Sequence, residues 1–196
     1  MQEVVVQDVG VREVKQNLKK TIELMIGDIT KLKLDAIVNA ANTSLLGGGG
    51  VDGAIHRAAG KELEFECRML GGCKVGQAKI TNGFNLPAQY IIHTVGPVWR
   101  GGNYKETGHL KLCYQNSLEL AEENQVSEIA FPAISTGIYN FPADLAAKIS
   151  MQVCSNFLQK TKIINKVIFC CFTKESARFY KDEINAQRSN KVEYIV

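Results

Sequence analysis

Residues 39–53 read Asn39-Ala40-Ala41-Asn42-Thr43-Ser44-Leu45-Leu46-Gly47-Gly48-Gly49-Gly50-Val51-Asp52-Gly53. Four consecutive glycines lose much backbone entropy on folding, so a folded protein keeps them where side chains would obstruct something. The residues that follow, Gly53–Ala59, favour the opening of a helix. A glycine loop that leads into a helix offers free N–H groups and the positive end of the helix dipole, which together bind anions. The stretch predicts a phosphate-binding loop, and Asp52 is its only ionisable residue.

Segments of two periodicities alternate along the rest of the chain. Short runs rich in Val, Ile and Phe predict strands, and amphipathic runs predict helices. The expected strands are Ile22–Ile26, Ala36–Asn39, Ala78–Gly83, Tyr90–Val95, Glu128–Ala133 and Lys166–Phe172. The expected helices are Gly53–Ala59, Leu63–Leu70, Leu110–Asn124, Ala143–Lys160 and Lys174–Gln187. This alternation predicts an α/β fold, a three-layer α/β/α sandwich with a central mixed β-sheet.

A second loop of small residues follows the expected strand Glu128–Ala133. It reads Pro132-Ala133-Ile134-Ser135-Thr136-Gly137-Ile138-Tyr139-Asn140-Phe141-Pro142 and also leads into a helix. In such folds ligands bind beyond the carboxyl ends of the strands, where both loops are expected. Neither loop contains Lys or Arg, which favours two phosphates held by backbone N–H groups. The pattern predicts a diphosphate ligand.

The sequence does not support either of two known glycine-rich nucleotide-binding motifs. Gly48-x-Gly50-x-x-Gly53 matches the dinucleotide fingerprint, but that motif begins directly after its strand and needs an acid at the end of the next strand. Here several residues separate the strand from Gly47, and Glu64 and Glu66 fall in a helix. A P-loop is excluded because the chain contains no Gly-x-x-x-x-Gly-Lys-[Ser/Thr].

Each polar residue of the first loop also has an ordinary structural explanation. Asp52 can favour a helix N-terminus through capping and the dipole alone. Asn39 and Asn42 can close turns through their side chains. His56 follows Asp52 by four residues, on the same helix face, where a lone histidine is usually structural. Their combination in one glycine-rich loop favours a functional site.

Composition places the chain among ordinary globular proteins. Its 196 residues fit an N-terminal extension over residues 1–20, a domain over 21–187 and a C-terminal tail over 188–196. An extra edge strand followed by a short helix is one interpretation of the extension, which the sequence leaves open. A hydrophobic fraction of 45% and a charged fraction of 22% exclude a disordered chain. A net charge of +3 makes nucleic acid an unexpected partner. We expect a monomer.

Targeting and cysteine patterns bear on the compartment. The first residues lack a signal-peptide pattern, and no apolar run is long enough for a membrane span. The six cysteines form no Cys-x-x-Cys pair and no zinc-finger spacing with His, so we expect reduced structural thiols and no metal. We expect a cytoplasmic location, with the nucleus as the alternative in a eukaryotic source.

With these motifs in order, the chain resembles a macrodomain of the MacroD type. The matching segments are Gly27-Asp28-Ile29-Thr30, Asp35-Ala36-Ile37-Val38-Asn39-Ala40-Ala41-Asn42, Leu45 to His56, Gly76-x-Ala78-Lys79-Ile80-Thr81, Tyr90-Ile91-Ile92-His93-Thr94-Val95-Gly96-Pro97 and Phe131 to Tyr139. The resemblance covers roughly Ile22 to Ile184. It implies the macrodomain fold and an ADP-ribose site. The Cys/His set of the zinc-binding branch is not evident here.

The resemblance implies roles for individual residues. Asp28 and the Ile29 backbone correspond to the adenine contacts, and Phe172 to the aromatic that stacks on adenine, although core packing would also explain Phe172. The diphosphate loops correspond to Gly48, Gly49, Gly50 and Val51, and to Ser135, Thr136, Gly137, Ile138 and Tyr139. Tyr139 also matches the aromatic against the distal ribose. Asn39 is counted with these ligand-binding residues.

The implied catalytic set is Asp52, with Asn42 orienting the distal ribose and His56 beside the acid. The MacroD branch removes ADP-ribose from protein carboxylate esters and deacetylates O-acetyl-ADP-ribose. The implied partners are therefore ADP-ribose, O-acetyl-ADP-ribose and mono-ADP-ribosylated proteins, with no cofactor. Two alternatives stay open: a substrate phosphate activates the water in place of Asp52, or the protein is a reader that binds ADP-ribose without hydrolysis. Readers generally lack the full Gly-Gly-Gly-Val-Asp-Gly arrangement.

One residue departs from the family pattern. Asn140 stands where the family usually has glycine. Asn tolerates the left-handed backbone region better than most residues, so we expect the loop path to survive. The side chain is also expected to narrow the distal-ribose side and so to affect which ester is accepted.

Overall fold

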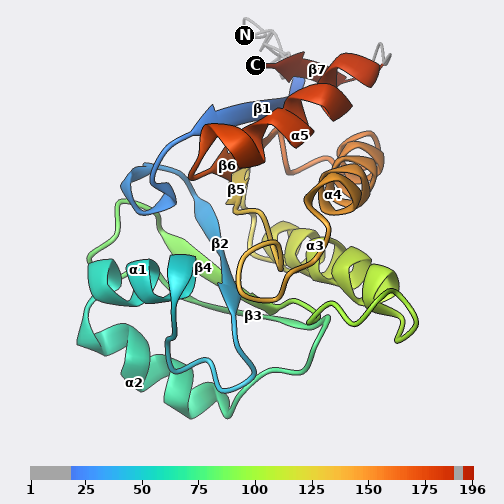
Figure 1. Ribbon diagram of the computed structural model, residues 1–196. Helices are drawn as coiled ribbons and strands as arrows, with labels where there is room; N and C mark the ends of the chain where they lie inside the picture. The colour runs from blue at the N-terminus through green and yellow to red at the C-terminus, as the bar shows by residue number, and fades with distance from the viewer. Residues whose placement is uncertain (1–18, 188–191) are drawn as a thin grey trace, which may run out of the picture.

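The computed structural model describes residues 19–187 and 192–196, which fold around one seven-stranded sheet (Figure 1). The strands are β1 Lys20–Ile26, β2 Ala36–Ala41, β3 Ala78–Asn82, β4 Tyr90–Val95, β5 Glu128–Phe131, β6 Lys166–Cys171 and β7 Val192–Ile195. Their order across the sheet is β3-β4-β2-β5-β6-β1-β7. Only the pair β3–β4 is antiparallel, so the sheet is mixed, as predicted.

Helices cover both faces of the sheet. They are α1 Gly50–Ala59, α2 Lys61–Leu70, α3 Glu106–Glu123, α4 Ala143–Leu158 and α5 Lys174–Ala186, with a short 3-10 helix η1 Ile29–Lys31. In Figure 1, α1 and α2 lie on one side of the sheet and α3, α4 and α5 on the other. Alternate strand residues therefore enter two separate cores: Ile37 and Ile91 pack under α1 and α2, and Val38 and Ile92 pack under the other helices. The predicted three-layer α/β/α sandwich is confirmed.

Two short elements were not expected. η1 is capped by Asp28, whose side chain accepts a hydrogen bond from the Thr30 N–H. β7 lies within the expected C-terminal tail and pairs in parallel with β1. It has only four residues, too few for a period-two pattern to stand out. The expected edge strand and helix in the N-terminal extension fall mostly outside the described residues, and Lys20 already belongs to β1.

The loop between β4 and α3 is held by a buried acid. Glu106 is 2% exposed, and its carboxylate accepts hydrogen bonds from the backbone N–H groups of Arg100 (3.0 Å), Gly102 (3.2 Å) and Tyr104 (2.6 Å). These bonds hold the pKa of Glu106 below its usual range, against the effect of its burial. The path of residues 100–104 is thus fixed by this one carboxylate.

That loop rests on the segment that follows β5. The Trp99 N–H donates to the Tyr139 carbonyl at 2.8 Å, and the Trp99 ring meets Phe141 edge-on with centroids 4.7 Å apart. Edge-to-face pairs of this kind stabilise beyond their buried area. The two segments therefore position one another.

The cysteines lie inside the protein. All six cysteines are free and buried. Burial raises the pKa of Cys67 to about 12, which keeps that thiol protonated. In the part of the chain that the structure describes, no helix combines the length and apolarity needed to cross a bilayer.

Candidate functional site

A cleft of about 820 Å³ lies at the carboxyl ends of the parallel strands. Its walls come from the segments after β1, β2, β4, β5 and β6, which is where open α/β sheets place their ligands. Among the residues predicted for the site, the cleft is lined by Asp28, Ile29, Asn42, Gly48, Gly49, Gly50, Val51, Asp52, Ser135, Thr136, Gly137, Ile138, Tyr139 and Phe172. Asn39 and His56 do not line it.

One wall is the N-terminus of α1. The N-cap residue Gly49 has no side chain to cap the helix, and Gly50, with φ +60°, turns the chain into its first turn. The first N–H groups of any helix have no partner within it, and the helix dipole adds positive potential there. This wall offers an anion N–H donors with no side chain in the way.

The opposite wall is the loop after β5. It folds back on itself through hydrogen bonds from the Asn140 N–H to the Gly137 carbonyl (2.9 Å) and from the Phe141 N–H to the Ser135 carbonyl (3.0 Å). The Ser135 hydroxyl is buried and, among the described residues, has no hydrogen-bond partner. A buried polar group without a partner costs about 1–3 kcal/mol. A polar ligand in the cleft would remove that cost.

The two walls nearly meet. A Cβ atom on Gly49 would lie 3.2 Å from Ile138 Cδ1 across the cleft. A Cβ atom on Gly48 would lie 3.0 Å from Asp52 Oδ2 and 3.2 Å from Asn42 Nδ2. The glycines are therefore required by close approach, and Gly48 marks the point where the side chains of Asp52 and Asn42 converge.

Asp52 ends a buried chain of hydrogen bonds. Asn39 Nδ2 donates to Asp52 Oδ1 (2.7 Å) and to His93 Nδ1 (3.1 Å), so both amide hydrogens are used. Because His93 Nδ1 accepts, its Nε2 carries the hydrogen and donates to Thr81 Oγ1 at 2.9 Å. The chain fixes the amide of Asn39 with its NH₂ toward the carboxylate.

Burial shifts the pKa values of two residues in this series of hydrogen bonds, His93 and Asp52. It lowers the pKa of His93 to about 3, with a smaller contribution from His56, so the His93 ring stays neutral. Burial also raises the pKa of Asp52 above its usual range, while the hydrogen bond from Asn39 and the nearby His56 oppose that rise. Asp52 is thus a desolvated carboxylate, which is a suitable environment for a general base.

The structure separates residues that touch the cleft from residues that support it. Asn39, expected to contact ligand, is fully buried behind Asp52, because its amide is occupied by Asp52 and His93. His56 Nε2 lies 3.5 Å from Asp52 Oδ1, so His56 can act on ligand only through that carboxylate. Asn42 lines the cleft and also closes its loop, donating to the Gly47 carbonyl at 2.8 Å.

The far end of the cleft, beside β1 and β6, is built from Asp28, Ile29 and Phe172. Asp28 Oδ1 accepts from the Thr30 N–H and hydroxyl, and these bonds lower the pKa of Asp28. Its second carboxylate oxygen has no partner among the described residues. Phe172 is 81% exposed, which excludes the core-packing explanation and leaves a flat aromatic surface at the rim.

Sequence reasoning missed two residues of this region. Arg57 lines the cleft together with Gly50 and Ala54, and the spacing of these three on one helix face was a signal for it. His93 is a fully buried imidazole in strand β4, and a polar side chain in a buried strand needs hydrogen-bond partners. Arg57 adds a positive charge to a cleft whose two loops contain none.

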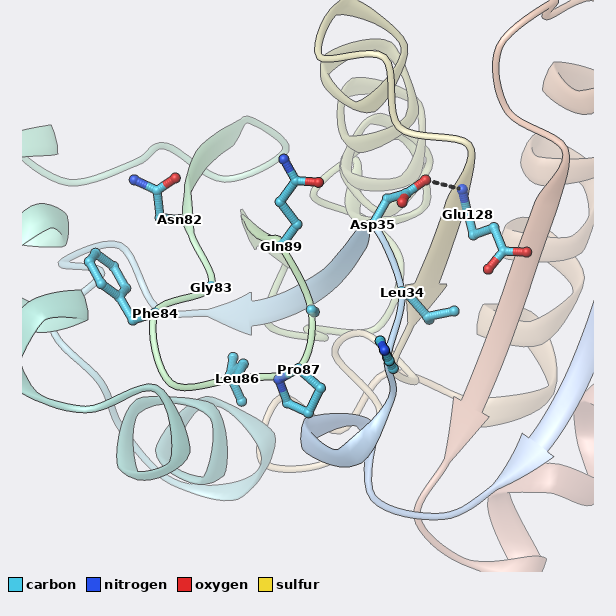
Figure 2. A pocket seen from close by; sticks show the side chains of 11 residues that line it. Leu34, Asp35, Asn82, Gly83, Phe84, Leu86, Pro87, Gln89 and Glu128 are labelled. Carbon is cyan, nitrogen blue, oxygen red and sulfur yellow. Dashed lines mark hydrogen bonds between the residues drawn. The ribbon is translucent and has the colours of Figure 1, made fainter.

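A second, more open pocket of about 420 Å³ lies at the opposite edge of the sheet (Figure 2). It is formed where β2, β4 and β5 begin. Its acid, Asp35, accepts hydrogen bonds from the backbone N–H groups of Ser127 (2.8 Å) and Glu128 (3.1 Å), as Figure 2 shows for Glu128. That carboxylate is thus used to join two strands, and the amino ends of parallel strands are not where such folds bind ligands. Within residues 19–187 and 192–196, no three His, Cys, Asp or Glu side chains are placed to hold a metal ion.

Asn140 adopts the left-handed conformation that glycine would take, with φ +52°, and its side chain donates to the Ile138 carbonyl at 3.3 Å. We expect Asn140→Gly to change ADP-ribose affinity by less than about threefold, since glycine adopts this conformation freely. Asn140→Val should lower the free energy of unfolding by about 1–2 kcal/mol and weaken binding, since a β-branched residue is strained there. Calorimetric titration and thermal unfolding of both variants test this, and equal behaviour of the two would contradict it.

The chain is similar to proteins of one known family. The family model described as Macro domain matches residues 38–150. Macro domain-containing protein mll7730 of Mesorhizobium japonicum is 59% identical over 167 residues, which is 85% of this chain and 95% of that protein. ADP-ribose glycohydrolase MACROD2 of Xenopus laevis is 54% identical over 177 residues, 88% of this chain and 42% of that longer protein.

Solved structures agree with the fold. A mutant of the Oceanobacillus iheyensis macrodomain, solved with ADPR, superposes with a TM-score of 0.81 at 41% identity, covering 87% of this chain and 94% of the other. The chain therefore belongs to the Macro domain family.

Proposed function

We propose that the protein is an ADP-ribose-binding hydrolase that cleaves esters on the distal ribose of ADP-ribose. The single observation that carries this is the buried Asp52 carboxylate at the cleft wall, with Oδ1 fixed by Asn39 and Oδ2 turned toward Gly48 and Asn42. The related MACROD2 is named an ADP-ribose glycohydrolase, and the related O. iheyensis macrodomain was solved with ADPR. Both support the proposal.

The cleft accommodates ADP-ribose along its length. Asp28, Ile29 and Phe172 offer a carboxylate, a backbone N–H and an aromatic face to adenine at one end. The N-terminus of α1 and the loop after β5 offer N–H groups to the diphosphate in the middle. Asp52, Asn42 and Tyr139 then surround the distal ribose at the other end. Because the substrate is held at three points, its reacting bond is positioned before any chemistry begins.

Ester hydrolysis consumes one water and yields a free carboxyl group and a ribose hydroxyl. A water beside Asp52 Oδ2 would give its proton to the carboxylate as it attacks, and that proton is later available to the departing ribose oxygen. Before this proton transfer, the hydrogen bond from Asn39 favours the ionised form of the carboxylate and orients it, and His93 orients Asn39 in turn. We propose two substrates on this chemistry: ADP-ribose linked to protein carboxylates, and O-acetyl-ADP-ribose.

The direct test incubates the protein with a peptide carrying glutamate-linked mono-ADP-ribose and, separately, with O-acetyl-ADP-ribose. We expect free ADP-ribose to be released from both substrates, and mass spectrometry measures that release. Calorimetric titration with ADP-ribose is run in parallel. Binding without hydrolysis of either ester would contradict the hydrolase and identify a reader, whereas hydrolysis of the acetyl ester alone would remove proteins from the substrates.

A further inference from the structure

Positive charge is concentrated in one part of the chain. Residues 71–118 contain five Lys or Arg and a single acid, Glu106. That acid is buried, and its carboxylate is bound by three backbone N–H groups and forms no ion pair with a surface cation among the described residues. With five cations and one acid, the segment carries a net charge of +4, although the whole chain carries only +3.

Three of these cations belong to segments that adjoin the end of β4, where the cleft wall passes. The cleft crosses the sheet from β1 and β6 to β2 and β4, and Gly96, directly after β4, is part of its wall. Arg100 and Lys105 belong to the loop that follows Gly96. Lys74 lies on the other flank, since its neighbour Val75 pairs with Val95 at the end of β4. We call Lys74, Arg100 and Lys105 the basic lip.

The basic lip is exposed and fixed in place. All three side chains are exposed, and within the described residues none forms an ion pair. Glu106 holds the backbone of the loop, and the Trp99 N–H ties it to the carbonyl of Tyr139, the residue placed against the distal ribose. The loop that carries Arg100 and Lys105 is therefore joined to the loop that carries Tyr139, which lines the cleft.

We propose that the basic lip binds acidic side chains of the polypeptide that carries the ADP-ribosyl ester. This inference rests on the proposed function, because the polypeptide is attached at the distal ribose and must leave the cleft at that end. Charges at the rim of a binding site act mainly on partner choice and association rate. A nucleic acid is the less favoured partner, since three separate cations do not form a continuous track for a phosphate backbone.

The test compares three substrates: a peptide with one ADP-ribosylated glutamate flanked by acidic residues, the same peptide with glutamines at the flanks, and O-acetyl-ADP-ribose. The wild-type protein should prefer the acidic peptide by about tenfold in kcat/KM. Arg100→Glu with Lys105→Glu should abolish that preference and leave O-acetyl-ADP-ribose turnover within about twofold. The preference should also shrink between 0.1 and 1 M salt, where the screening length falls from about 10 to about 3 Å.

The matched control is Lys160→Glu with Lys162→Glu, which reverses two exposed charges between α4 and β6, at the opposite edge of the sheet. It should keep the preference, and an equal loss in both double variants would overturn the proposal. Equal kcat/KM of the wild-type protein for the two peptides would also overturn it. So would an Arg100→Glu, Lys105→Glu variant that loses as much activity on O-acetyl-ADP-ribose as on the acidic peptide. So would stronger competition by a single-stranded oligonucleotide than by the acidic peptide at equal charge. The same peptides are titrated against Asp52→Ala, so that a basic lip without effect is distinguished from a protein without hydrolase activity.

Discussion

Replacing Asp52 with alanine is expected to lower ester turnover by about 10²- to 10⁴-fold, which is the usual contribution of a general base. ADP-ribose affinity should change by less than about threefold, since the contacts proposed for the diphosphate are backbone N–H groups elsewhere in the cleft. Single-turnover assays with a carboxylate-linked substrate measure the first quantity and calorimetry the second. Turnover equal to that of the wild type would instead assign water activation to a substrate phosphate.

The same role predicts a pH profile. Asp52 acts as a base only when ionised, and burial raises its pKa, so the rate should fall on acidification at a pH above that of an exposed aspartate. The polar groups around the carboxyl are His56 on α1, Asn39 on β2, His93 on β4 and Cys67 on α2. Asn39→Ala removes the hydrogen bond that opposes the rise, so it should move the acid limb to higher pH. An unchanged limb would remove Asp52 from the proton transfer.

Gly53→Ala is expected to damage both stability and binding. A Cβ atom on Gly53 would lie 2.3 Å from the Gly48 carbonyl oxygen, and that atom belongs to the backbone and cannot rotate away. Either the first turn of α1 or the glycine loop must shift. Overpacking of this kind costs about 2 kcal/mol of the free energy of unfolding, or roughly 4–8 °C in Tm. Because the shift moves the N–H groups of the cleft, ADP-ribose affinity should fall by more than about tenfold.

Gly108→Ala is the matched control for this variant. Gly108 lies in the first turn of α3, and a Cβ atom there would meet nothing within 4 Å. Alanine at an unobstructed helix position stabilises by about 0.5–1 kcal/mol, so Tm should rise slightly and binding should not change. Calorimetry and thermal unfolding of both variants decide the matter, and a Gly53→Ala protein that binds ADP-ribose normally would show that the loop has room to move.

The regular elements were predictable because their patterns are local. Tyr90–Val95 was predicted with the same bounds, since a run of β-branched and aromatic residues has little alternative to a buried strand. α1 begins three residues earlier than Gly53, because Gly50 and Val51 have no helical pattern of their own and join the helix through packing against the loop. β7 depends on pairing with β1, a contact that nothing within its four residues specifies.

The site was predictable where it depends on backbone and sequence order. Composition and spacing predicted the two glycine-containing loops and Asp52, and in the structure all three line one cleft. The support for Asp52 was not predictable, because Asn39, His93 and Thr81 come from three strands and meet only through the sheet. Glu106 was missed for a different reason: its partners are backbone N–H groups of the preceding loop, which carry no side-chain signal.

In the proposed complex, the walls of the cleft offer a diphosphate their main-chain amides, and this has an evolutionary consequence. Every non-proline residue supplies the same N–H, so positions such as Val51, Thr136 and Ile138 can drift among homologues without loss of the ligand contact. Selection should instead preserve the backbone path. That path needs glycines where a Cβ atom would clash, and residues that adopt the left-handed conformation where the backbone turns. In a library that carries every substitution at each position of the loops, most substitutions at Gly48 and Gly53 should abolish ADP-ribose binding. Most substitutions at the neighbouring positions should leave binding intact.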